Sequence, residues 1–151
     1  MALDDDIRIL SGVGLFEGFS QEQLRLLAFG AESMRLPAQR KLYLEEDEAD
    51  SAYVVVKGSI VLFSEGDAAR TPIATVKPGA ILGELALVGD TRRLTSAAAA
   101  TDAEVLRLNR KMFRRILEEY PELAIGLHRR ITEELQALIR RIEEVAPRLA
   151  P

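Results

Sequence analysis

Residues 78–93 read Pro-Gly-Ala-Ile-Leu-Gly-Glu-Leu-Ala-Leu-Val-Gly-Asp-Thr-Arg-Arg. Their middle part is helix-prone, and a short helix that begins at Gly83 points free backbone N–H groups and the positive end of its dipole at whatever lies in front of it. Glycine there removes the Cβ that would keep an anion away from the backbone. Arg93 follows ten residues later and can form a charge-assisted contact with the same anion. The stretch therefore predicts an anion site.

Glu84 stands beside this predicted anion site. A carboxylate and a bound anion repel each other, so the presence of a glutamate here needs a separate explanation. A carboxylate accepts hydrogen bonds from hydroxyl groups, and a phosphate with a neighbouring sugar hydroxyl together describe a nucleotide. Two plainer interpretations stay open at this point. The segment 83–87 also fits an ordinary helical turn, and Arg92 and Arg93 also fit a pair of solvated arginines in a loop.

Short β-prone segments lie on both sides of this stretch, separated by Gly, Pro and Asp residues typical of turns. Several short strands at roughly 8–12-residue spacing predict an antiparallel sandwich or barrel, most commonly a jelly roll at this chain length. The predicted strands are 41–44, 52–56, 60–63, 72–76, 97–101 and 105–108.

Helical patterns flank the β-prone region. Ser20 and Gln23 have capping-box spacing and predict a helix over 20–31. Two more helices are predicted after residue 110, one over 111–120 and a longer one ending near Val145, with Pro121 in the first turn of the second. The long helix carries one apolar stripe, formed by Leu127, Ile131, Leu135, Leu138, Ile142 and Val145. This stripe fits either a homodimer seam or packing against the chain's own β-roll.

The composition indicates one globular domain over 1–151, with a helical N-terminus (1–32), a β-roll (33–109) and C-terminal helices (110–146). The chain has no Cys and a single histidine, His128, so a metal-dependent enzyme or a thiol nucleophile is not expected, and neither is a cofactor. The net charge of -4 argues against a phosphate-backbone binder. Acidic residues near the N-terminus and the lack of a long apolar run favour a cytoplasmic protein without membrane contact.

The run Gly83-Glu84-Leu85-Ala86-Leu87 followed by arginine resembles the phosphate-binding cassette of cyclic nucleotide-binding domains. Such domains occur in protein kinase A regulatory subunits, cyclic-nucleotide-gated channels and catabolite-activator-type regulators. The similarity extends from Leu15 and Phe16, through Asp47, Ala49 to Val55, Gly58 and Pro78-Gly79, to the closing helices. It implies a mainly β fold, an eight-stranded, cupin-like jelly roll with an N-terminal helix and C-terminal helices.

The resemblance also implies roles for individual residues. Glu84 matches the ribose-binding glutamate and Arg93 the phosphate-binding arginine, while a one-residue slip would put Arg92 in that place. Leu94 stands where the family has a small residue, and Glu46 stands where it commonly has Gly. The full set of candidate ligand-binding residues is Gly83, Glu84, Leu85, Ala86, Arg92, Arg93, Leu94 and Thr95.

The resulting hypothesis is a stand-alone, non-enzymatic sensor in which a bound cyclic nucleotide repositions the C-terminal helices and so signals to an effector protein that the sequence does not identify. Cyclic AMP is favoured over cyclic GMP, because Leu94 lacks the hydroxyl that often favours guanine. Specific DNA binding is not expected, because residues 146–151 leave no room for a recognition helix. The alternative is a degenerate jelly-roll interaction module that binds no nucleotide and acts through its amphipathic C-terminal helix.

Overall fold

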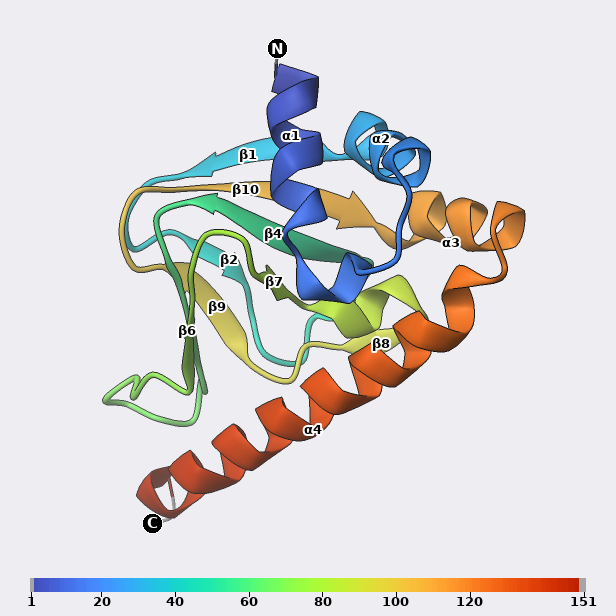
Figure 1. Cartoon of the computed structure of the whole chain (residues 1–151). Coiled ribbons are helices and arrows are strands. Elements are labelled where there is room, and N and C mark those ends of the chain that lie inside the picture. Colours follow the sequence, from blue (N-terminus) through green and yellow to red (C-terminus); the bar gives the residue numbers. More distant parts are fainter. Residues whose placement is uncertain (1, 150–151) are drawn as a thin grey trace.

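Two four-stranded antiparallel sheets pack face to face, with helices covering one of them (Figure 1). The computed structural model describes residues 2–149, with side chains for residues 3–145. The first sheet has the order β1 (Glu32–Leu36), β10 (Ala103–Asn109), β4 (Ser51–Lys57) and β7 (Ile81–Leu82). The second has the order β2 (Lys41–Tyr43), β9 (Ser96–Ala99), β5 (Ile60–Phe63) and β6 (Ala74–Val76). A separate pair joins β3 (Glu48–Ala49) to β8 (Thr91–Arg92). The predicted jelly-roll fold with flanking helices is confirmed.

Helices precede and follow the sheets. The N-terminal ones are α1 (Ala2–Ser11), the 3-10 helix η1 (Gly14–Phe16) and α2 (Gln21–Gly30). The second 3-10 helix, η2 (Glu84–Leu87), interrupts the strands, and α3 (Arg110–Glu119) and α4 (Leu123–Leu149) close the chain. The predicted capping box is present: the Ser20 amide donates to Gln23 Oε1 at 2.8 Å and the Gln23 amide to Ser20 Oγ at 3.2 Å. Asn109 caps α3 in the same manner, accepting from the Met112 amide at 2.8 Å.

Strand β4 has core on both faces, which explains its nearly unbroken apolar sequence. Alternate side chains of a strand point to opposite faces. Val54 therefore packs under the helices, whereas Tyr53 and Val55 pack between the two sheets. The molecule consequently has two hydrophobic cores separated by the first sheet.

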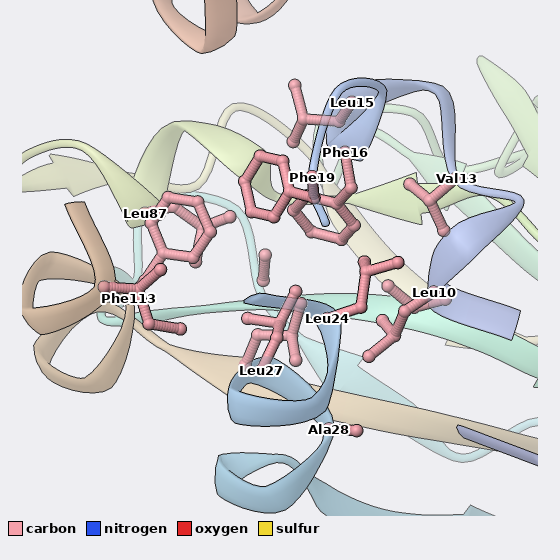
Figure 2. Packing of buried hydrophobic residues seen from close by; sticks show 14 of the residues in the cluster. Leu10, Val13, Leu15, Phe16, Phe19, Leu24, Leu27, Ala28, Leu87 and Phe113 are labelled. Carbon is pink, nitrogen blue, oxygen red and sulfur yellow. The ribbon is translucent and has the colours of Figure 1, made fainter. Parts of the chain in front are cut away.

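An aromatic cluster fills the core under the helices (Figure 2). The ring centroids of Phe16 and Phe19 are 5.2 Å apart, and those of Phe16 and Phe113 are 6.1 Å apart. Figure 2 shows Leu87 of η2 beside Phe113 of α3. The packing thus connects η1 and α3 to the helical insertion between the strands.

Three details differ from the sequence predictions. Pro121 lies in the turn before α4 rather than in its first turn, and its carbonyl accepts from the Ala124 amide at 3.1 Å. Helix α4 extends to Leu149, beyond the expected end near Val145. Strand β1 and the two-residue strands β3, β7 and β8 were not among the predicted strands, and a two-residue segment has no periodicity of its own. Within residues 2–149, no helix has both the length and the apolar character needed to span a bilayer.

Candidate ligand-binding site

A cavity of about 290 Å³ opens between the second sheet, η2 and α4. All eight candidate residues from the sequence line it, although they come from η2, from β8 and from the segments that flank these two elements. Helix α4 closes one side of the cavity with Glu134, Leu135 and Leu138. The fold therefore gathers the predicted residues around one space and adds a wall from the C-terminal helix.

Gly83 is required by its close approach to Arg93. Its φ of 73° lies in the left-handed region, where glycine carries no steric penalty. A Cβ at this position would lie 2.4 Å from Arg93 Nη1, closer than Cβ atoms normally approach another atom, so the Arg93 side chain would have to shift. The Ala86 amide already donates to the Gly83 carbonyl at 3.1 Å. An anion in front of η2 would therefore be bound by the N–H groups earlier in the turn and not by that of Ala86.

Arg93 is the buried cation of the site, with only 6% of its surface exposed. Its Nη2 donates to the Ser51 carbonyl at 2.7 Å, while its Nε and Nη1 have no hydrogen-bond partner. No carboxylate within the described residues forms an ion pair with it. The guanidinium carbon instead lies 4.2 Å from the centre of the Tyr43 ring and 5.7 Å from that of Tyr53. A buried guanidinium with two unused donor atoms is an incomplete anion site.

Arg92, its neighbour, has the opposite environment. Its side chain is 63% exposed, donates from Nη1 to the Glu46 carbonyl at 3.0 Å and lies 3.8 Å from the Glu48 carboxylate. Of the two arginines between which the sequence left a choice, the geometry favours Arg93 as the ligand-binding one.

The turn at Glu46 fixes the backbone of Arg93. The Glu46 amide donates to the Arg93 carbonyl and the Arg93 amide to the Asp47 carbonyl, both at 2.9 Å. Glu46 has a φ of 74°, the left-handed conformation expected where related chains commonly have glycine. This conformation costs a non-glycine residue about 1 kcal/mol.

Glu84 is the second polar group of the cavity and is 9% exposed. Its carboxyl group is hydrogen-bonded to that of Glu134 on α4. Burial, followed by the charge and hydrogen bond of Glu134, raises the pKa of Glu84 to about 8. Burial also raises the pKa of Glu134. One of these two facing carboxyl groups therefore keeps a proton at neutral pH.

Two important residues, Tyr43 and Glu134, were missed by the sequence analysis. Burial raises the pKa of Tyr43, against the opposing effects of the Arg93 charge and of a hydrogen bond with Thr95, so Tyr43 remains a neutral ring. Glu134 had a detectable signal, because it lies three residues after Ile131 and four before Leu138 and so borders the apolar stripe. Tyr43 had none, since only the sheet pairing brings β2 next to Arg93.

The described residues contain no cluster of three or more His, Asp or Glu side chains that could hold a metal ion. His128 is exposed on α4, as expected of a solvated helical histidine. The polar side chains that line the cavity are thus three arginines, two glutamates, two threonines and a tyrosine.

Comparison with known proteins agrees with the fold and the motif. A cyclic nucleotide-binding-like protein from Brucella abortus is 60% identical, with a TM-score of 0.69 over 76% of this chain and 99% of that one. The cyclic AMP receptor protein of Thermus thermophilus is 29% identical over 148 residues, covering 93% of this chain and 68% of that protein. A cAMP-dependent protein kinase regulatory subunit from Neurospora crassa is 33% identical over 91 residues, covering 60% of this chain and 23% of the subunit.

The chain therefore spans less than a quarter of the kinase subunit and about two thirds of the receptor protein. The family model of the cyclic nucleotide-binding domain matches residues 33–120, which is more than half of the chain and includes every candidate residue. Together with the jelly roll and the buried arginine behind Gly83, this match shows that the chain belongs to the cyclic nucleotide-binding domain family.

Proposed function

We propose that the chain is a non-enzymatic sensor that binds a cyclic nucleotide in this cavity, with Arg93 on the phosphate and Glu84 on the ribose. The observation that carries the proposal is the buried Arg93 guanidinium, whose Nε and Nη1 lack partners. Leaving a charged group buried without its hydrogen bonds is costly, and an anionic ligand restores them. Glu84 then supplies the acceptor for a sugar hydroxyl close to the bound phosphate.

Cyclic AMP is the proposed ligand, in preference to cyclic GMP. Two of the relatives described above carry cyclic AMP in their names. Leu94 borders the cavity and has no hydroxyl group to offer to guanine. Leu94 is 43% exposed, and the cavity that it borders measures about 290 Å³ with this side chain in place. The cavity therefore remains open despite this bulky residue, which favours the sensor over an interaction module that has lost its ligand.

The proposed signal passes through the C-terminal helices. Helix α4 forms one wall of the cavity, and α3 inserts Phe113 beside Leu87 of η2. A ligand that draws η2 toward its phosphate would alter both contacts at once. The ligand shifts the equilibrium between helix positions only to the extent that it binds the protein more tightly when the helices are in one of these positions.

The test is titration calorimetry with cyclic AMP on wild-type protein and on two arginine variants. Arg93→Ala is expected to weaken binding by about 2–4 kcal/mol, or roughly 30- to 1,000-fold, because it removes the buried charge that faces the phosphate. Arg92→Ala is the matched control and is expected to cost under about 1 kcal/mol, because Arg92 is a solvated surface residue.

Circular dichroism should show that both variants are folded. The proposal fails if Arg93→Ala binds cyclic AMP as tightly as wild type does, or if the wild-type protein shows no binding at millimolar ligand.

A further inference from the structure

The contact between Glu84 and Glu134 places a side chain of the protein itself at the predicted ribose position. Glu84 belongs to η2 and Glu134 to α4, and the two elements pack against each other across the cavity. Two carboxyl groups in hydrogen-bond contact need a proton between them, because two carboxylates would repel each other. The contact therefore exists only while one of the two is protonated.

The surrounding charges do not neutralise this pair. The other ionisable groups that line the cavity are Tyr43 of β2, Arg92 of β8, Arg93 directly after it, and Arg141 of α4. Arg93 donates to the Ser51 carbonyl, and Arg92 contacts Glu46 and Glu48. Within the part of the chain that the structure describes, no ion pair joins Glu84 or Glu134 to an arginine. A shared proton is thus the available means of holding the two carboxyl groups together.

We propose that Glu134 occupies the ribose-hydroxyl position of the empty site by sharing a proton with Glu84, so that an incoming cyclic nucleotide must displace Glu134 and release this proton. The inference rests on the proposed function, because the displacing group is the sugar hydroxyl of the ligand. Glu134 is then a competitor carried on α4, and its displacement connects ligand binding to the position of that helix.

The direction of the pH dependence follows from the proton balance. The empty protein carries one shared proton; in the complex, Glu84 is an ionised acceptor and Glu134, released to solvent, returns toward the ordinary glutamate pKa of about 4.3. Acid therefore favours the empty protein in which Glu134 contacts Glu84 (the closed site), and the affinity for cyclic AMP rises with pH. The rise spans the interval from about pH 5 to the raised pKa of Glu84, about 8. It is at most about tenfold per pH unit, and above this interval the affinity becomes constant.

Calorimetry on the full chain measures the released proton directly. Cyclic AMP is titrated at pH 6.5 in chloride solutions buffered with MES or with imidazole, whose ionisation enthalpies differ. The difference in the observed heat gives the number of protons exchanged, which is expected to approach one released proton per ligand. An observed proton count near zero contradicts the inference.

The variant Glu134→Gln keeps the contact with Glu84 but removes the shared proton, so it tests the two effects separately. The glutamine amide donates to the Glu84 carboxylate without needing a shared proton, so the site stays closed at every pH. We expect no proton release and a flat affinity profile, similar to wild type at pH 6 and at least tenfold weaker than wild type at pH 8. Glu133→Gln is the matched control: Glu133 is exposed on the same helix, and this variant should keep the wild-type pH profile.

A measurement without ligand makes failure of this inference distinguishable from failure of the proposed function. Carbon-detected NMR of the empty protein should show a glutamate carboxyl that titrates well above its ordinary range, and Glu134→Gln should abolish this coupled step. If every glutamate titrates below pH 6, the shared proton does not exist, whether or not cyclic AMP binds. If wild type binds cyclic AMP and its affinity profile matches that of Glu134→Gln, the sensor stands and the role of Glu134 is wrong.

Discussion

Two aromatic rings take the place of solvent around the buried guanidinium of Arg93. Its guanidinium lies over the faces of Tyr43 and Tyr53, and a ring face attracts a cation without using any of its N–H groups. The Ser51 carbonyl takes one donor atom and leaves Nε and Nη1 unpaired. The rings therefore hold the arginine in place while leaving its hydrogen bonds available to a ligand.

A pair of Tyr43 variants tests this role. Tyr43→Leu removes the ring and is expected to weaken cyclic AMP binding about 5- to 30-fold, equivalent to the 1–2 kcal/mol of a desolvated cation–π contact. Tyr43→Phe keeps the ring and should bind within about threefold of wild type. Calorimetry measures both affinities, and circular dichroism checks the fold. Equal affinities of the two variants would mean that the ring does not position Arg93.

The sequence could predict those site residues that lie close together along the chain. Gly83, Glu84 and Arg93 fall within eleven residues, so local geometry alone brings them together. Glu134 follows Glu84 by fifty residues and Tyr43 precedes it by forty-one, so their positions depend on helix docking and strand pairing. The spacing of residues along the sequence gives no direct information about such long-range contacts.

At the scale of elements, the strands with strong local character were predicted, whereas β1 and the two-residue strands were not. Strand β5 has the predicted bounds, and β4 and β10 are each slightly longer than expected, because their β-branched and leucine side chains fit a pleated core. Strands β7 and β8 exist because β4 and β3 pair with them, not because of their own residues. The insertion η2 was recognised through its break in the β pattern, and it proved to be a 3-10 helix.

Helix α3 is held on the roll mainly by Phe113, which is fully buried between Phe16, Phe19 and Leu87. Phe113→Ala is expected to lower the free energy of unfolding by about 3–5 kcal/mol, since it removes a buried ring and leaves a cavity. Phe29, 82% exposed on α2, provides the control. Phe29→Ala should change the stability by less than about 0.5 kcal/mol. Urea denaturation followed by circular dichroism gives both values, and similar losses would contradict this view of the core.

At the scale of the whole molecule, α4 spans both hydrophobic cores. Leu127 and Ile131 are buried in the core under the helices, and Val145 is buried in the core between the sheets. Leu138 and Ile142 pack against the second core, and Figure 1 shows α4 (orange to red) running along the β8 end of the roll. Of the two interpretations that the sequence allowed for the apolar stripe, this arrangement is the intramolecular one. A homodimer through the same residues would require α4 to leave the roll.

We therefore expect the chain to be a monomer in solution. Light scattering at tens of micromolar should give the mass of one chain, 16.7 kDa, because all of the apolar stripe except Leu135, which lines the cavity, packs on the chain's own cores. Among the α4 side chains that the structure describes (123–145), the large apolar residues left exposed are Ile125 at 83% and Ile139 at 40%, which lie fourteen positions apart. A doubled mass would show that α4 or another surface forms a dimer, and a mass that rises only with cyclic AMP would assign the association to a released α4.

The unfilled donors of Arg93 also bear on how this protein must be handled. Phosphate and sulfate offer the same oxygen atoms as a nucleotide phosphate, and the cavity does not distinguish them until a sugar and a base are attached. On the proposed role of Arg93, such ions are expected to compete for the guanidinium at the concentrations of common buffers and precipitants. With the proposed function, the measured affinity for the nucleotide depends on the solution as well as on the protein, so assays of cyclic AMP binding belong in buffers free of phosphate and sulfate.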